Sequence, residues 1–473
     1  MRKGLLGSIA VLTAGAGLAY GQGPSRGMAP PAPIMPSGLY SGGVQQASHG
    51  TPDIIPSPIG QPAMNGIPQD PSGMGQPMYP QPGMYGGSPY PDAGMGGPGG
   101  GGANSSVPNW WFNGEYCLWF SKSQTVTQPF VTTSSPGDFG VIGAPTTQLL
   151  YSPKDISYGA ASGFRLMGGW WKDTDKRCGF EFGGFLMEEK TKLFGASSDN
   201  NGVPTLARPF IQAGGGQSVF IVSNLGLASG SIGINTTTRA YGLEANGIYN
   251  LYRSCPDSKC FWSVDSIVGF RFFQLREDLN FATESTILNG GATFVGQPVA
   301  NGSQIIINDG FETINRFYGA NLGLRSSVVS GRWIFSSSAK IALGAMTSSI
   351  DVTGITTLRD AGLGLNSTAQ GGVLATQQNI GNYHSDNFAV MPEIALNLGY
   401  QWTSCFSTYI GYNGLYANKV LRPGNSLPTA VNPSLMPSSN NYGVGAVTPV
   451  INNSTNLTEY YIQGVTFGFR LQF

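Results

Sequence analysis

The chain has 473 residues, and its 25 Lys and Arg balance its 25 Asp and Glu, so the formal net charge at pH 7 is zero. Charged residues make up only 11% of the chain, against about 25% in an ordinary soluble domain, whereas its 70 glycines are about twice the usual share. The balanced charge argues against a nucleic-acid partner, and the lack of a run of about 18 apolar residues beyond the N-terminus excludes a helical membrane protein.

Residues 1–21 have the pattern of a secretory signal peptide. Arg2 and Lys3 form a short basic region, residues 4–18 form an apolar stretch, and small residues precede a cleavage site before Gln22. The apolar run is too short and too rich in Gly and Ala for a membrane anchor. We therefore expect an exported chain in an oxidising compartment.

Residues 22–107 differ in composition from the rest of the chain. Of these 86 residues, 20 are glycine and 17 are proline, and only four are charged. Such a segment cannot bury a packed core. We predict a disordered Pro/Gly/Met-rich arm that acts as a tether or a sticky segment.

The remaining segment, 108–473, is predicted to be β structure nearly throughout, because apolar and polar residues alternate with a period of two. The last strand shows this most clearly, since one of its faces is apolar and the other is polar or glycine. The apolar face consists of Tyr461, Val465, Phe467, Phe469, Leu471 and Phe473. The same division recurs at 112–120, 262–272, 322–328 and 388–402.

The connections between these strands alternate between two sizes. Short turns are predicted near 173–177, 253–259, 330–331 and 403–404, and long polar loops near 121–157, 190–236, 276–311, 348–386 and 418–457. Soluble domains rarely contain structureless loops longer than about 12 to 15 residues, whereas short turns on one side and long loops on the other are typical of outer-membrane barrels. We therefore predict a transmembrane antiparallel up-and-down β-barrel of about ten strands. An extra hairpin at 219–235 would make twelve.

Aromatic residues cluster at the expected strand ends, for example at Trp110, Trp170, Tyr249 and Trp402. They fit girdles in which amphipathic rings lie at the depth of the lipid headgroups. Pro392 lies within a strand pattern, where proline is poorly tolerated, and we interpret it as a bulge.

The chain also resembles a known family, the planctomycete outer-membrane β-barrel proteins numbered seventh in their naming scheme. The matching stretches are GEYCLWFSKSQTVTQPFVTTSSPG at 114–137, GFRLMGGWW at 163–171, GFEFGGFLMEE at 179–189 and GYNGLYANKVLRPGNSLPTAVNPS at 411–434. The most specific of them surrounds Arg422. The resemblance covers 108–473 and implies an outer-membrane barrel, but no activity, ligand or catalytic residue.

Ten charged residues fall on the polar faces of the proposed strands, and we expect them to point into the lumen. They are Glu115, Arg165, Glu181, Glu244, Asp265, Arg271, Arg325, Lys340, Glu393 and Arg470. A barrel of about eight strands is filled by its own side chains, and a wide channel needs about 16 to 18 strands. Ten strands with paired interior charges therefore predict a plugged or narrow lumen. An ion-selective constriction is the functional alternative.

The chain has five cysteines, four of which lie at the predicted short turns. Cys255 and Cys260 enclose one turn, and we predict a local disulfide between them because this side would face an oxidising compartment. A zinc site is disfavoured, because no His lies near these cysteines and the turns belong to separate hairpins. We expect no metal and no cofactor.

His384 is the one histidine of the barrel segment, and it stands beside Ser385 and Asp386 at the end of a predicted long loop. Adjacent residues of an extended chain point in opposite directions, so these three residues cannot form a catalytic triad among themselves. We therefore expect no enzymatic activity and name no catalytic residue.

These patterns predict a bacterial outer-membrane barrel with a structural, tethering or surface-display role. The first alternative is a narrow porin for small solutes or ions, and the second is an outer-membrane enzyme. Expected partners are outer-membrane lipid, the barrel-assembly machinery, and cell-wall or surface polymers bound by the arm and the long loops. The terminal strand is a candidate assembly signal, carried by Tyr461, Phe467, Phe469, Leu471 and Phe473.

Overall fold

The computed structural model describes residues 109–126, 128–254, 260–289, 291–444 and 456–473. The predicted signal peptide and the Pro/Gly-rich arm lie outside the described residues. None of the described residues belongs to a helix long and apolar enough to cross a membrane.

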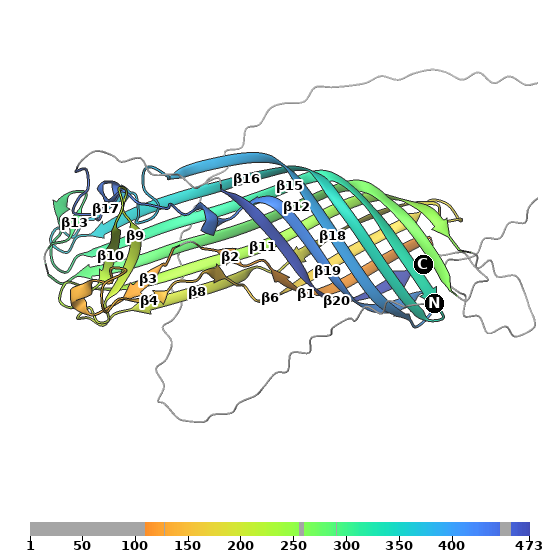
Figure 1. Ribbon diagram of the computed structural model, residues 1–473, viewed down its shortest axis with the longest axis horizontal. Coiled ribbons are helices and arrows are strands. Elements are labelled where there is room, and N and C mark those ends of the chain that lie inside the picture. The colour runs from red at the N-terminus through yellow and green to blue at the C-terminus, as the bar shows by residue number, and fades with distance from the viewer. Residues whose placement is uncertain (1–108, 127, 255–259, 290, 445–455) are drawn as a thin grey trace, which may run out of the picture. The chain divides into compact units, whose positions relative to one another are not determined.

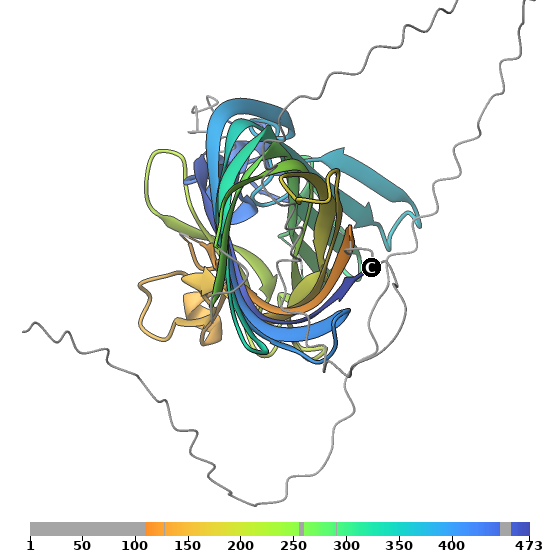
Figure 2. The ribbon, with the colours of Figure 1, turned by 90° about the vertical axis from the view of Figure 1, so that its right-hand side faces the viewer.

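Ten antiparallel strands form a closed ring, which Figure 2 shows end on. In ring order they are β1 (Trp110–Ser121), β6 (Ala160–Trp171), β7 (Cys178–Met187), β11 (Ala228–Arg253), β12 (Phe261–Ile287), β15 (Gln304–Ser330), β16 (Trp333–Arg359), β18 (Gly381–Gln401), β19 (Phe406–Leu421) and β20 (Leu457–Gln472). β20 pairs with β1 and closes the ring. The predicted all-β barrel of ten strands is therefore confirmed. The alternative of twelve strands is wrong, because 219–235 adds no hairpin to the ring: residues 219–223 belong to β10 of a separate sheet, and residues 228–235 are the start of β11.

Short elements occupy the end of the barrel away from the tight turns (Figure 1). β8 (Lys190–Ser197) extends the edge of β11, and β17 (Asn366–Gln370) extends the edge of β16. A separate sheet has the strand order β10 (Gln217–Ser223), β9 (Leu206–Ile211), β3 (Val131–Thr133) and β4 (Gln148–Tyr151). The other short elements are the pairs β2 (Gln124–Thr125) with β5 (Asp155–Ile156) and β13 (Thr293–Phe294) with β14 (Gln297–Pro298), and the 3₁₀ turns η1 (Pro136–Asp138), η2 (Pro423–Ser426) and η3 (Pro433–Leu435).

The polarity of the wall inverts along each long strand. On β12, the outward side chains are mostly apolar from Trp262 to Phe272 and mostly polar beyond it. The inward side chains are polar at Asp265 and Arg271 and mostly apolar from Phe273 onward. We call the part of the wall with apolar outward side chains the band, and the part beyond it the extension. The band suits lipid outside and charge inside, and the extension suits water outside and an apolar core inside.

The extension corrects three of the predicted long loops. Most of 190–236, 276–311 and 348–386 is strand. The first segment contains β8, β9, β10 and the start of the 26-residue strand β11, and the other two contain parts of β12, β15 and β16, which are each 27 residues long. A tilted strand crosses a bilayer with approximately 9 to 11 residues. Strands of this length therefore continue far beyond the part that a bilayer can cover. Their outward Thr, Ser and Asn side chains resemble a loop composition because this part of the wall faces water.

On the outer surface of the band, aromatic rings cluster at the end with the tight turns. Trp110 stacks on Trp170 with ring centroids 5.5 Å apart, and Trp333 meets Tyr400 at 5.2 Å. Pro392 does not mark a bulge, because β18 pairs with β16 through Pro392 without a shift in register. Pairing of β18 with β19 ends at Glu393, so Pro392 lies beyond that ladder.

Both ends of the described barrel lie at the end with the tight turns, as Figure 1 shows. The Trp110 backbone N–H donates to the Phe473 carbonyl at 2.9 Å, and the Phe473 N–H donates to the Trp110 carbonyl at 3.1 Å. The last residue of the chain is thus part of the seam that closes the ring.

Candidate functional site in the barrel lumen

Opposite charges face each other on neighbouring strands inside the band. Four of these cross-strand pairs lie directly in register, and each joins an acid to a base: Glu115 with Arg165, Glu244 with Arg271, Asp265 with Arg325, and Lys340 with Glu393. Side chains directly opposite each other on one face of a sheet are close enough to interact. The alternation that turns apolar residues toward lipid therefore places these charges in pairs inside the barrel.

A cluster of ion pairs then crosses the lumen from one wall to the other. The carboxylate of Glu244 on β11 forms ion pairs with Arg271 Nη2 at 2.6 Å and with Lys340 Nζ of β16 at 2.8 Å. Glu393 on β18 contacts Arg271, Lys340 at 3.3 Å and Arg165 at 3.2 Å. All five side chains are largely buried. Charges at this depth are tolerated only when each is neutralised by a partner, so the cluster is a packed ionic layer across the barrel.

Amide and hydroxyl groups complete this layer. Asn321 donates to Glu244 at 3.3 Å, and Tyr409 donates to Glu115 at 2.9 Å. Nearer the turns, Arg325 binds Glu181 at 2.6 Å, and Asn250 donates to Asp265 at 2.7 Å. Arg470 lies with its guanidinium 5.2 Å from the centre of the Trp111 ring.

Between the ionic layer and the tight turns lies a polar cavity of about 120 Å³. Ser336, Ser338, Asn397, Ser407 and Asn113 line it together with charged groups of the layer. It has room for a few water molecules, which polar walls of this kind bind. We call this space the chamber.

A second closure lies in the extension, where connecting segments fold back between the walls. We call residues 371–380 and 421–437 the plug. Arg422 is the anchor of the second segment: its Nε and Nη2 each donate to the Glu277 carboxylate at 2.7 Å, and its Nη1 donates to the Ser123 carbonyl at 2.8 Å. Both charged side chains are almost completely buried. Burial alone would lower the pKa of Arg422, but the Glu277 carboxylate raises it above its ordinary value.

Asp309 anchors the first plug segment. Its carboxylate accepts the backbone N–H groups of Leu374 at 3.0 Å and Ala375 at 2.8 Å, and it pairs with Arg208 of β9 at 2.8 Å. A Cβ added at Gly372 would lie 2.1 Å from the Asp309 carboxylate, so only glycine fits there. One buried acid thus holds a loop and a separate strand against the wall.

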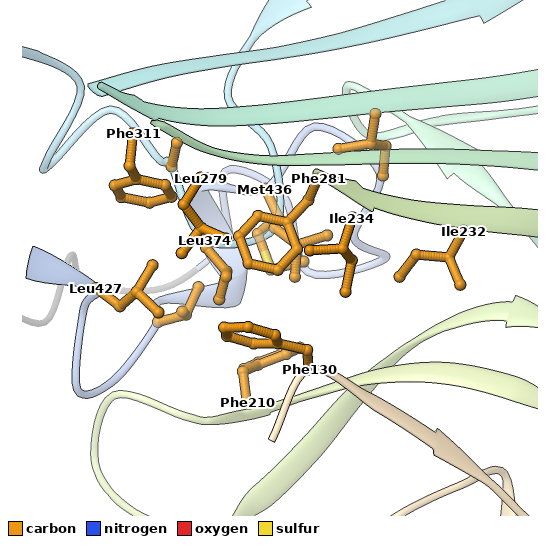
Figure 3. Close-up of a cluster of buried hydrophobic side chains, with 14 of the residues drawn as sticks. Phe130, Phe210, Ile232, Ile234, Leu279, Phe281, Phe311, Leu374, Leu427 and Met436 are labelled. Atoms are coloured by element: carbon orange, nitrogen blue, oxygen red, sulfur yellow. The ribbon is translucent and has the colours of Figure 1, made fainter. Parts of the chain in front are cut away.

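Apolar side chains of the plug pack on the inner wall of the extension, as Figure 3 shows. Leu374, Leu427 and Met436 come from the plug, and they share one buried cluster with Leu279 and Phe281 of β12. From the opposite side, the Phe130 ring meets Phe281 edge on, with centroids 4.9 Å apart. The lumen of the extension is therefore filled by a hydrophobic core.

The cysteines singled out in the sequence are placed only in part by the structure. Cys255 lies outside the described residues, so the predicted disulfide with Cys260 stays a prediction. Cys178 and Cys405 are exposed at the turns, and Cys117 is buried in the wall. Among the residues placed by the structure, no group of His, Cys, Asp and Glu has the arrangement of a metal site.

His384 corrects a prediction, because it lies within β18 and not in a loop. It is exposed on the outward face, and Ser385 is on the opposite face. On β20, Tyr461, Phe467, Phe469 and Phe473 are exposed on the outer wall, and Leu471 shares their face.

Sequence reasoning missed the anchors Glu277, Asp309 and Arg208. Glu277 and Asp309 fall in segments that were predicted to be loops, and Arg208 falls in another. A signal for Glu277 was available, since it continues the inward series Phe273, Leu275, Leu279 and Phe281 with a period of two.

The comparisons with known proteins place the chain in one family. The profile of the family described as "Putative beta barrel porin-7 (BBP7)" matches residues 111–473. A search of the curated proteins found no match.

Several solved structures match the chain at low sequence identity. The outer membrane protease OmpT of Escherichia coli is 12% identical, with 77% of this chain and 97% of that one covered and a TM-score of 0.34. The TodX deltaS2S3 mutant monoaromatic hydrocarbon channel is 8% identical, with 78% and 93% covered and a TM-score of 0.20. A FadL homologue of Pseudomonas aeruginosa is 8% identical, with 77% and 89% covered and a TM-score of 0.20.

The family match extends over the whole ring, from β1 to the terminal residue of the seam. The chain therefore belongs to the beta barrel porin-7 (BBP7) family.

Proposed function

We propose that the protein is a structural barrel of a bacterial outer membrane, which carries its N-terminal arm at the end with the tight turns and displays the extension at the other end. The observation that carries this proposal is the double closure of the lumen. An ionic layer crosses the band, and an apolar plug fills the extension. A barrel built for passage would leave a continuous polar path.

Planar-bilayer conductance of the purified full chain tests this proposal. We expect no stepwise currents, because ions would have to displace both the ionic layer and the plug. A general-diffusion porin in the same bilayer serves as the control that insertion and detection work. Reproducible steps of one size from the folded barrel would contradict the proposal.

A narrow porin is the second candidate, and one observation favours it. The chamber already provides a polar path through part of the band, and the family is described as a porin. Passage would then require the plug to leave the extension. If steps occur, Lys340→Met should change their ion selectivity, because Lys340 lies in the ionic layer.

The tethering role rests on where the arm joins the barrel. Asn109, the first described residue, precedes the seam between Trp110 and Phe473. In an outer-membrane barrel the short turns face the periplasm, so the arm would start on that side and reach cell-wall polymers. We expect a chain lacking 22–107 to insert and fold, because a segment rich in Gly and Pro adds no core. That chain should lose co-sedimentation with isolated cell wall. Equal co-sedimentation would remove the tethering role.

We also propose that the terminal strand is recognised by the barrel-assembly machinery. Its outward aromatic face ends at Phe473, whose backbone pairs with Trp110 only once the ring closes. We expect Phe473→Ser to reduce the fraction recovered in the outer membrane, with periplasmic accumulation, and Tyr461→Ser to have a smaller effect. Equal recovery of the Phe473 variant and the unchanged chain would contradict this role.

The proposal includes neither enzymatic activity nor a cofactor. Ser385 faces away from His384, which offers no support for nucleophilic catalysis. A planctomycete origin also stays a prediction.

A further inference from the structure

The outer wall of the band carries a groove of about 1070 Å³, which is lined by residues of β1, β6, β7, β11 and β12. Four glycines line it, of which Gly168 and Gly184 face outward and leave the outer side of the backbone uncovered, whereas Gly169 and Gly183 face the lumen against Trp111 and Met167. Aromatic and aliphatic side chains stand around them, among them Phe164, Leu166, Trp170, Phe182, Leu186 and Leu243.

The rim of this groove is strongly exposed and apolar. Phe164 and Phe182 have exposed fractions of 59% and 60%, and Leu166 has 53%. A wall that merely faces fluid lipid needs apolar side chains but no hollow. A hollow with a glycine floor has the shape and chemistry to hold an alkyl chain.

Cationic side chains line the groove where the band meets the extension. Arg239 of β11 and Arg276 of β12 both contribute, and they lie directly opposite each other in register. Like charges in this position repel each other unless an anion lies between them. Arg276 already pairs with Glu312 at 2.8 Å and lies 3.9 Å from the Asp278 carboxylate. Arg239 makes no ion pair or side-chain hydrogen bond with any residue whose position is described.

We propose that this groove binds one anionic, phosphate-bearing lipid, with an acyl chain over the outward glycines Gly168 and Gly184 and the phosphate at Arg239 and Arg276. A guanidinium group donates two parallel hydrogen bonds to phosphate oxygens. On the side of the extension, Arg239 is one outward position beyond Tyr241 of β11, and Arg276 is two outward positions beyond Phe272 of β12. We therefore place both arginines at headgroup depth. This inference uses the membrane placement of the band but not the closed lumen, so a conducting barrel would leave it intact.

Native mass spectrometry of the full chain in detergent micelles tests the site. Phosphatidylglycerol is the probe, and phosphatidylcholine, which has the same chains and no net charge, is the comparison. We expect one retained phosphatidylglycerol per barrel and at least about tenfold less phosphatidylcholine, which corresponds to about 1.4 kcal/mol. Arg239→Gln should remove this preference.

A glycine substitution tests the groove separately from the charge. A Cβ at Gly168 would meet no atom closer than 3.7 Å, so Gly168→Leu should fill the groove without moving the backbone and reduce retention of both lipids. Gly247→Leu is the matched control, because Gly247 faces outward on β11, its Cβ would have 3.6 Å of room, and it does not line the groove. Heat-dependent gel mobility verifies that each variant is folded.

Three outcomes would overturn the proposal. The first is equal retention of the two lipids by the unchanged chain. The second is unchanged retention of phosphatidylglycerol in either the Arg239 or the Gly168 variant. The third is a particle of two chains without lipid, which would place a second copy of the barrel in the groove.

Discussion

Along β12, the band and the extension place polar and apolar side chains on opposite faces. Phe270 points outward in the band and is 49% exposed, whereas Phe281 points inward in the extension and is 1% exposed. The backbone is continuous between them, and the pairing with β15 keeps its register. The medium outside the wall, and not the strand geometry, therefore determines which face is apolar.

The same comparison applies to buried charge. In the band, charges fill the lumen as a layer of mutual ion pairs. In the extension, single charged pairs such as Arg422 with Glu277 are surrounded by an apolar core and hold loop segments in place. In the band, side chains of the wall strands close the lumen. In the extension, the plug segments close it, and the buried charged pairs hold these segments in place.

Removal of the Arg422 anchor should have the largest effect. We expect Arg422→Leu to reduce the stability of the plug by about 3–5 kcal/mol, because it leaves the Glu277 carboxylate buried without its partner. Limited proteolysis should then cut the plug while the gel mobility of the folded band persists. The double variant with Glu277→Leu should recover much of the resistance. Lys122→Met, which breaks the more exposed pair with Glu459, is the control and should cost at most about 1 kcal/mol.

Truncation of one aromatic residue in the band and one in the extension of β12 should reduce the free energy of unfolding by different amounts. Phe281→Ala should reduce the free energy of unfolding by about 3–5 kcal/mol, because it leaves a cavity in the packed core of the extension. Phe270→Ala should cost less, because lipid can fill the space that the ring leaves. Denaturant unfolding of both variants in the same lipid measures the difference, and an equal or reversed order would refute the assignment of the two regions.

An outward arginine should discriminate between lipid and water outside the wall. Val268→Arg in the band should cost about 2–4 kcal/mol, because a charge near the middle of a bilayer is poorly solvated. Asn280→Arg in the extension should change the free energy of unfolding by no more than about 0.5 kcal/mol. Both positions are outward and exposed on β12. Similar effects at the two sites would mean that the band does not end between them.

The smallest effect concerns Lys176, in the turn between β6 and β7. Burial, together with the nearby cations of Arg253 and Arg470, lowers the pKa of Lys176 from 10.5 to about 8. Between these two values the unfolded chain binds the proton more readily than the folded chain, so stability should rise as the pH increases through this window. Lys176→Met should lack that rise. Unfolding at pH 7 and pH 10 compares the two, and parallel behaviour would contradict a buried Lys176.

The strand pattern predicted the ring, because strands are recognised by a period of two, and the same period assigned the ten charged residues to the polar faces. The ion-pair partners of those charges could not be predicted from the sequence. Glu244 meets Lys340, and Glu393 meets Arg271, across the lumen between strands that are not neighbours. No local pattern encodes such pairs, because they exist only once the ring has closed at a particular diameter.

By itself, the sequence determined the antiparallel ring and which side chains share a face of each strand, since side-chain direction in a strand depends only on position along it. Only the tertiary structure decided that the strands continue far beyond the band and that segments 371–380 and 421–437 fold inward as a plug. These segments have no periodicity of their own. Their burial depends on distant anchors, the Asp309 carboxylate for the N–H groups of Leu374 and Ala375 and the Glu277 carboxylate for Arg422, which satisfy polar groups that would otherwise keep a loop in water.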